Sequence, residues 1–288
     1  MTERPLRFGL SVIDPAVDWP AVAREAERLG YDVVAAVDHV GRSAPFPSLV
    51  AAAAATERPR VGTYITNASF WEPALLAREV ASVDRLTGGR LELGIGAGQS
   101  VVASTAGWSP ERRLAHLTET VEVVLRLLAD PGHSPRGVQS PRPPLLIGGN
   151  EDGELALAAR HADTVAFTGA HLSAGGGFTL LSAEELAERV AFVREAAAGR
   201  EIEFNIGVKR VVVTDDRRAG AAAVRDLAPQ LSVDQLLDLP TVLIGTHEQM
   251  AEQIRKHRAA YGFSYVMVLG EYVREFAPVI RLLREDGQ

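Results

Sequence analysis

Short runs of consecutive apolar residues alternate with helical patterns along most of the chain, and this alternation limits the possible folds more than any other feature. Runs that are apolar at every position are typical of strands covered on both faces, as in a parallel sheet between helices. The first pair is a strand at residues 7–12 and a helix at residues 19–30, with Asp18 as the expected N-cap and Gly30 as the C-cap. About eight such pairs follow one another in 288 residues.

This count favours a (β/α)8 barrel, which typically needs about 250 residues. The second possibility, an open doubly wound sheet, usually has a G-x-G-x-x-G motif after its first strand, and the sequence "GLSVIDPAVDW" lacks it. No segment has the composition of a linker, so we expect a single domain over residues 1–288. Within it, residues 203–214 are expected to form one strand, and the residues that follow 169 a glycine-rich insertion.

The composition excludes several classes of function. A net charge of −7 and an isoelectric point near 5.6 argue against nucleic acids and anionic membranes as partners. Cysteine is absent, which excludes disulfides and thiolate nucleophiles. The histidines are scattered, so no metal site is expected. The first residues lack the apolar region of a signal peptide and no apolar run is long enough to cross a bilayer, so we expect a cytoplasmic protein.

In a barrel of this kind the active site lies where the strands end. The run "VVAAV" ends in Asp38 and His39, which form either a catalytic pair or an ordinary polar turn. Glycines end several other strands, where they allow a planar or anionic ligand to approach the backbone, although such loops often contain glycine for other reasons. The other residues expected at strand ends are Ser11, Thr66, Asn67, Gly96, Gly98, Gln99, Gly148, Gly149, Asn150, Thr168, Gly169, His171 and residues 209–216 and 270–272.

An ordered series of motifs over more than 200 residues resembles the bacterial luciferase-like flavin and deazaflavin oxidoreductases, which are TIM barrels. The series consists of "AERLGYDVVAAVDH", "PALLAREVASVDRLTGGRLELGIGAG", "PLLIGG" and "TVLIGTHEQMAEQI". Any one of these motifs alone would be weak evidence. Their common order makes the resemblance specific for this family and its fold.

The family divides between users of FMN and users of coenzyme F420, an 8-hydroxy-5-deazaflavin, and this chain is most similar to the F420 branch. The resemblance implies transfer of a hydride between C5 of the reduced deazaflavin and an electron-poor C=C or C=N bond of a small-molecule or peptide natural-product substrate. It also implies a homodimer. An FMN-dependent monooxygenase and a non-catalytic barrel that binds the cofactor are the alternatives.

The resemblance implies roles for the strand-end residues. His39 would move the proton that accompanies the hydride, and Asp38 would fix the tautomer of His39 or bind the ring edge. A non-prolyl cis peptide is implied between Tyr64 and Ile65. The residues implied to lie along the cofactor are Tyr64, Ile65, Thr66, Asn67, Gly96, Gly98 and Gln99 for the ring, and Gly148, Gly149, Asn150, Thr168 and Gly169 for the phosphate region.

The substrate side is less typical of the family. Ser11, Trp71, Glu72 and His171 are the expected contacts. Several F420-dependent relatives have a proton-donating Glu at the position of Gln99, and an amide cannot donate a proton in this way. His39, or Glu72 if it points inward, would then supply the proton.

Overall fold

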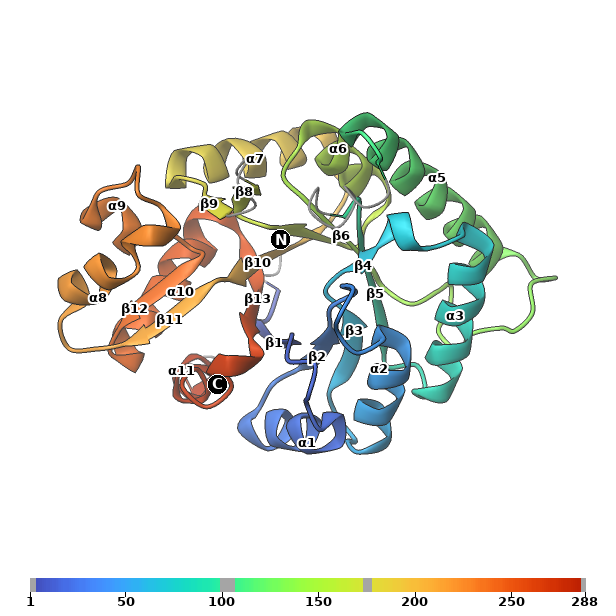
Figure 1. Ribbon diagram of the computed structural model, residues 1–288, viewed down its shortest axis with the longest axis horizontal. Coiled ribbons are helices and arrows are strands. Elements are labelled where there is room, and N and C mark those ends of the chain that lie inside the picture. The colour runs from blue at the N-terminus through green and yellow to red at the C-terminus, as the bar shows by residue number, and fades with distance from the viewer. Residues whose placement is uncertain (1–3, 99–106, 173–177, 286–288) are drawn as a thin grey trace.

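The computed structural model describes residues 4–98, 107–172 and 178–285. Eight parallel strands form a closed barrel with helices on its outside, which confirms the predicted (β/α)8 fold (Figure 1). Pairing of β3 with β5 completes the ring, and β13 lies between β1 and β10. The barrel strands are β1 (Arg7–Val12), β2 (Val33–Ala36), β3 (Arg60–Thr63), β5 (Leu91–Gly96), β6 (Leu145–Gly149), β7 (Thr164–Phe167), β10 (Glu203–Val208) and β13 (Phe263–Leu269).

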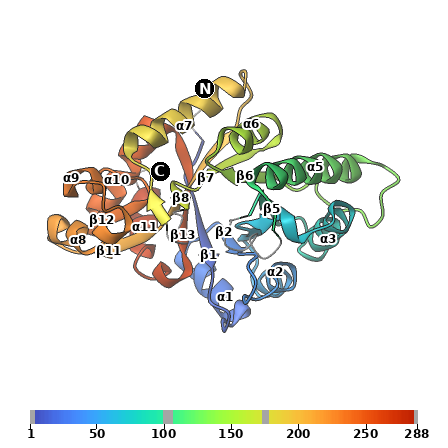
Figure 2. The ribbon, with the colours of Figure 1, turned by 45° about the horizontal axis from the view of Figure 1, so that its top comes forward.

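The first outer helix begins and ends where the sequence predicts. The carboxylate of Asp18 accepts a hydrogen bond from the Ala21 amide, and Gly30 ends the same helix with a left-handed φ of 92°. Figure 2 shows neighbouring helices following one another around the barrel. These helices are α1 (Trp19–Leu29), α2 (Pro45–Ala54), α3 (Pro73–Leu86), α5 (Pro110–Ala129), α6 (Asp152–His161), α7 (Ala183–Ala196), α10 (His247–Tyr261) and α11 (Ala277–Glu285).

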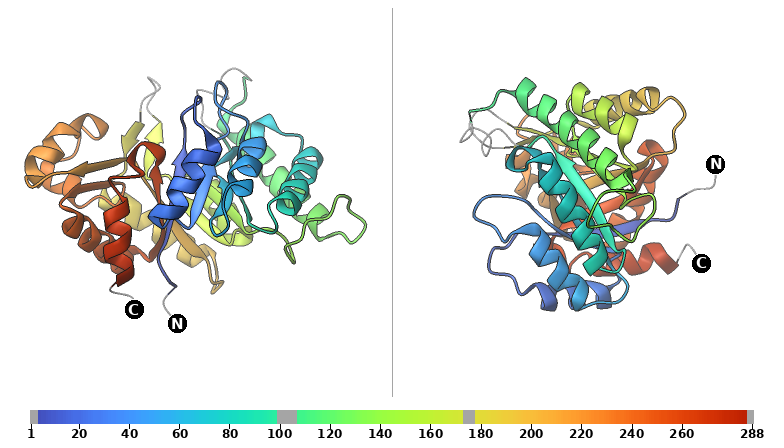
Figure 3. Two further views of the ribbon diagram at one scale, coloured as in Figure 1. Left: turned by 90° about the horizontal axis from the view of Figure 1, so that it is seen from below. Right: turned by 90° about the vertical axis from the view of Figure 1, so that its right-hand side faces the viewer.

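The segment between β10 and β13 differs from the prediction. The expected single strand 203–214 breaks at Lys209, because the Lys209 amide donates to the Thr241 carbonyl (2.7 Å) instead of continuing the barrel ladder. The chain then forms a small second sheet at the side of the barrel (Figures 1 and 3). This side unit contains β11 (Arg210–Val213), α8 (Arg217–Ala223), η3 (Arg225–Leu227), α9 (Val233–Leu237) and β12 (Val242–Gly245).

Several short elements surround the ends of the barrel strands. The glycine-rich insertion contains an antiparallel hairpin of β8 (Ala170–Leu172) and β9 (Phe178–Leu180). After β3 the chain passes through Tyr64 and Ile65 and forms β4 (Thr66–Asn67), which pairs with β5, and then the short helix η1 (Ala68–Phe70). A last short helix, η4 (Gly270–Tyr272), follows β13.

Side chains fill the barrel interior, beginning at the N-terminal ends of the strands. Arg7 lies at that end and forms ion pairs with Glu92 (2.7 Å) and Glu203 (2.6 Å), both almost completely buried. Its guanidinium group also stacks on the Tyr265 ring, 4.2 Å from the centroid. An apolar layer that includes Met267 lies in the same interior. The strand ends at the other side of the barrel are therefore the place for a site.

Candidate active site

Asp38 follows β2 and is nearly buried. Its Oδ2 atom accepts hydrogen bonds from the indole Nε1 of Trp71 (2.8 Å) and from the backbone amide of Asn67 (3.1 Å). Burial raises the pKa of Asp38 above its usual value, whereas these two hydrogen bonds act in the opposite direction. The Asp38 carboxylate therefore fixes the position of Trp71 and of β4 relative to the end of β2.

His39 comes next, and its side chain reaches the surface. Protein atoms around part of the ring lower its pKa below the usual value, and Arg42 acts in the same direction, while Asp38 opposes them. The imidazole is therefore neutral at pH 7 and able to accept a proton.

In the described part of the chain, no hydrogen bond joins Asp38 to His39, and Asp38 Oδ2 accepts from Trp71 and Asn67 instead. The predicted role of Asp38 in fixing the tautomer of His39 is thus wrong for this structure.

The peptide bond between Tyr64 and Ile65 is cis, as the family resemblance implied. Tyr64 crosses the barrel interior, and its hydroxyl donates to Asn205 Oδ1 (2.8 Å) on β10, which lies directly across the barrel from β3. Ile65 lies against two glycines at neighbouring strand ends. A Cβ atom added to Gly96 would be 2.3 Å from Ile65 Cδ1, and one added to Gly148 would be 3.0 Å from it. These glycines hold the apolar side chain of Ile65 at the barrel mouth.

Three other predicted glycines also make room for side chains of the protein. A Cβ atom on Gly98 would be 2.1 Å from the side-chain oxygen of Asn67. Gly149 faces Glu154, and Gly169, with a left-handed φ of 64°, faces Thr241. Sequence reasoning attributed the small size of these residues to a ligand, whereas the structure shows protein contacts. Gln99 lies outside the described residues, and its role stays a prediction.

The region predicted to receive a phosphate is acidic. The backbone amides of Asn150 (3.1 Å) and Glu151 (3.4 Å) donate to Glu154 at the start of α6, so these donors are already used. The side chain of Asn150 binds the Ala170 carbonyl (2.6 Å) and the Gly169 amide (3.3 Å). With Glu151 as its N-cap and Asp152 and Glu154 in its first turn, this helix start is unfavourable for a phosphate group, and the predicted phosphate contacts stay a prediction.

The structure places the four predicted substrate contacts in different surroundings. Trp71 is half-buried and packs edge-to-face against Phe46, 5.2 Å between ring centroids. Glu72 does not point inward: its carboxylate accepts from the Leu75 amide (2.9 Å) and caps α3, so its predicted roles as proton donor and substrate contact are wrong. Ser11 is buried in β1, and His171 is exposed, 3.7 Å from a carboxylate oxygen of Glu151.

The hydroxyls of the two predicted cofactor-contacting threonines, Thr66 and Thr168, also have different surroundings. The Thr66 hydroxyl is buried in β4 without a described partner, and that of Thr168 lies 3.4 Å from the Ala170 carbonyl oxygen. Neither contact identifies a ligand.

Lys209 opens the range 209–216 that was predicted to lie at a strand end, but no role was predicted for it. It directly follows β10 and, by strand alternation, points into the barrel like Asn205 and Gly207. Its Nζ atom is 3.5 Å, and Tyr64 Oη is 2.9 Å, from the position of a Cβ atom added to Gly207. Burial lowers the pKa of Lys209 to about 8. The alternation Asn205–Gly207–Lys209 was the available signal, but the expected continuous strand hid it.

Replacing Lys209 with methionine is expected to stabilise the protein by about 1–3 kcal/mol at pH 7, because it removes a half-buried cation that has no described partner. The pKa of Lys209 is about 8 in the folded state, against 10.5 for an ordinary lysine side chain. The gain is therefore fully present below pH 8 and is lost as the pH rises toward 10.5. Urea unfolding at several pH values measures it.

Lys256→Met is the matched control, because Lys256 pairs with Asp238 at the surface (2.7 Å) and contributes at most about 1 kcal/mol. A Lys209→Met variant that is no more stable than the wild type at pH 7 would contradict the prediction. A stability gain that does not change with pH would contradict it too.

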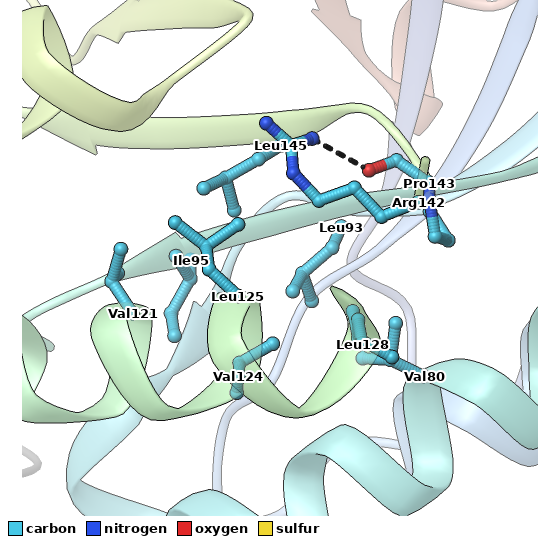
Figure 4. A pocket seen from close by; sticks show the side chains of 10 residues that line it. All are labelled: Val80, Leu93, Ile95, Val121, Val124, Leu125, Leu128, Arg142, Pro143 and Leu145. Atoms are coloured by element: carbon cyan, nitrogen blue, oxygen red, sulfur yellow. Dashed lines mark hydrogen bonds between the residues drawn. The ribbon is translucent and has the colours of Figure 1, made fainter. Parts of the chain in front are cut away.

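A small cavity lies elsewhere, on the outer side of β5 and β6 (Figure 4). It is bounded mainly by apolar side chains of α3 and α5, and the guanidinium of Arg142 at its edge donates to the Pro143 carbonyl (2.9 Å). It is a gap in the packing between helices and barrel, away from the strand ends. Among the described residues, no helix has the length and apolar character needed to cross a membrane.

The fold and the strand-end residues define a (β/α)8-barrel protein with its candidate site at the barrel mouth. A family model described as luciferase-like monooxygenase matches residues 13–237, and the chain belongs to this family.

The chain is 28% identical over 162 residues to a 5,10-methylenetetrahydromethanopterin reductase of Archaeoglobus fulgidus, which covers 51% of this chain and 47% of the relative. It is 25% identical over 179 residues to the reductase of the same name from Methanolobus tindarius, covering 58% and 55%. The matches thus span about half the length of these relatives.

Solved structures share the fold over nearly the whole chain. An F420-dependent secondary alcohol dehydrogenase in complex with an F420–acetone adduct has a TM-score of 0.77 and 17% identity, covering 98% of this chain and 100% of the other. The F420-dependent tetrahydromethanopterin reductase of Methanopyrus kandleri has a TM-score of 0.73 and 19% identity, covering 97% of each. A monooxygenase from Streptomyces bottropensis has a TM-score of 0.74 and 22% identity, covering 97% and 98%.

Proposed function

We propose that the protein is an F420-dependent oxidoreductase that transfers a hydride between C5 of the deazaflavin and an electron-poor C=C or C=N bond of a small-molecule or peptide natural product. Similarity to the methylenetetrahydromethanopterin reductases supports this proposal. The observation that carries it is the position of Ile65, which rests on Gly96 and Gly148 at the mouth, beside the strand end that bears His39. We also propose that the protein acts as a homodimer.

The residues of the mouth fit the ring of a deazaflavin better than its phosphate. Ile65 would offer an apolar surface to one ring face, and Asp38, which accepts a hydrogen bond from the Asn67 backbone amide, would lie at the ring edge. The acidic start of α6 disfavours phosphate, so we assign no phosphate ligand there. When bound, the deazaflavin supplies the hydride chemistry.

The chain's own residues would handle the proton and the water. The neutral imidazole of His39 accepts or returns the proton at a ring nitrogen. Trp71, fixed by Asp38, forms a wall that keeps water from the reacting atoms. Ile65 excludes water from the face of the ring that it contacts.

Titration with F420 and with FMN tests the cofactor. We expect F420 to bind at least about tenfold more tightly than FMN, as measured by the change in visible absorption, and reduced F420 to be consumed by a panel of unsaturated compounds and imines. Ile65→Ala should weaken F420 binding, while Ile202→Ala, far from the mouth at the start of β10, should not.

The main alternative is an FMN-dependent monooxygenase, which the solved monooxygenase structures with this fold favour. Tighter binding of FMN, together with oxygen consumption by the reduced flavin complex, would replace the F420 proposal with this one. Binding of F420 without redox change across the panel would instead favour a barrel that only binds the cofactor.

A further inference from the structure

We propose that Lys209 recognises the substrate, and that its ammonium group binds a carboxylate of the substrate at the barrel mouth. This inference rests on the proposed function, because it names the substrate class of the same site. It starts from a cation in the barrel interior that the hydride-transfer chemistry itself does not use.

The first observation is where the Lys209 ammonium points. Asn205 and Gly207, which share its side of β10, contact the Tyr64 hydroxyl in the interior. Gly207 has no side chain, so the space above it is left to Tyr64 Oη and Lys209 Nζ, which lie 2.9 and 3.5 Å from its Cβ position. The Tyr64 hydroxyl gives its hydrogen to Asn205 and therefore does not compete for an anion. Lys209 is the group in this space that has hydrogens to donate.

The second observation is the lack of a counter-charge. In the described residues, no carboxylate forms an ion pair with Lys209, and no charged group contributes to its pKa, which burial alone lowers. Of the segments that the structure does not describe, the two internal ones, 99–106 and 173–177, contain neither Asp nor Glu, whereas the two terminal ones contain Glu3 and Asp286. An ammonium group with three donors that is partly removed from water is costly unless an anion arrives. The missing anion is thus a ligand.

The third observation is the choice of residue. The chain has only two lysines among its thirty basic residues, Lys209 and Lys256. Arginine's planar fork suits bidentate groups and phosphates, whereas lysine is a compact point charge on a flexible stem. One lysine suits one negative charge, and Asp38 and the acidic start of α6 elsewhere at the strand ends disfavour a doubly charged phosphate. The geometry therefore points to a carboxylate.

The two lysines make a direct test possible. Protein labelled with ¹³C at the lysine ε-carbon gives one signal for each lysine, and the probes are benzoate and its neutral analogue benzamide. We expect benzoate to shift the Lys209 signal and to raise its pKa, because a nearby anion favours the charged form. Lys256 should not respond, and benzamide should have no effect. Equal responses of both lysines, equal effects of both probes, or no response at all would overturn the proposal.

Benzoate affinities of lysine variants test whether the ¹³C response of Lys209 reports binding at this residue. Lys209→Met should weaken benzoate binding about tenfold or more, Lys209→Arg should weaken it less than about threefold because the charge remains, and Lys256→Met should leave it unchanged. Retention of benzoate affinity in Lys209→Met would contradict the inference.

A titration with F420 separates the possible sources of the carboxylate. Lys209→Met should not change F420 affinity, and benzoate should bind to the F420 complex. A tenfold loss of F420 affinity, with exclusion of benzoate by F420, would assign the anion to the cofactor and overturn the inference. Failure to bind F420 at all, with the benzoate response intact, would refute the proposed function and not the carboxylate site.

Discussion

Replacing His39 with alanine is expected to lower kcat by about 10²–10⁴-fold, the usual contribution of a positioned acid–base group, and to leave the thermal midpoint nearly unchanged. The His39 side chain is exposed and makes no hydrogen bond in the described structure, so its loss removes chemistry and little packing. Steady-state rates with reduced F420 and the best substrate of the panel, together with thermal unfolding, measure both effects.

His161→Ala is the matched control for this prediction. It lies in the last turn of α6, at the end of the barrel away from the mouth, and its pKa is also lowered chiefly by burial. Its turnover should stay within about twofold of the wild type. Full turnover in His39→Ala would remove His39 from the mechanism, and a large fall in its thermal midpoint would assign it a structural role instead.

The pH profile separates these roles further. Because the pKa of His39 is lowered, its neutral form persists to more acidic pH than that of an ordinary histidine. If the neutral form accepts the proton, the rate falls only when the pH drops below the usual histidine range. The His39→Ala variant should lack this acidic limb.

Arg7→Met is expected to cost about 3–5 kcal/mol of stability at neutral pH. Arg7 neutralises two buried carboxylates, those of Glu92 and Glu203, through charge-assisted hydrogen bonds. After the substitution Arg60 still pairs with Glu92 (2.7 Å), but among the described residues Glu203 keeps only the hydroxyls of Thr164 (3.1 Å) and Ser264 (3.4 Å). A buried charge without its partner is the source of the loss. Urea unfolding monitored by circular dichroism measures it.

Two variants sharpen this result. Arg78→Met removes an exposed pair with Glu79 (2.9 Å) and should cost no more than about 1 kcal/mol. Adding Glu203→Gln to Arg7→Met should restore part of the stability, because it removes the uncompensated charge. Equal costs for Arg7→Met and Arg78→Met would show that the buried network does not stabilise the barrel.

Much of the barrel was predictable because each of its strands is a local apolar run between helix signals. The side unit was not, since "RVVV" at residues 210–213 reads the same whether it continues β10 or pairs with β12. Strand pairing is a non-local property, and the amide of Lys209 decides it here by binding Thr241. For the same reason the sequence did not show that residues 242–245 form a strand, β12.

The site was predictable in position more than in role. The strand ends that carry Asp38, Ile65 and Gly148 were identified correctly as the mouth of a barrel. Sequence alone could not tell that Ile65 fills the space above its neighbouring glycines, because both partners are distant in the chain. Nor could it tell that Glu72 caps a helix, a role fixed by a single side-chain rotamer.

Because β13 lies between β1 and β10, the barrel cannot close until β13 has been synthesised. The first strand leaves the ribosome with one edge unpaired, and that edge has no partner until residues 263–269 have been translated. Until then the nascent chain is an open sheet with two exposed strand edges, which favour pairing with other chains. The side unit between β10 and β13, Arg210–Gly245, prolongs this interval by 36 residues. Closure of the barrel therefore depends on the most distant contact in the sequence, and folding is expected to be slow for this reason.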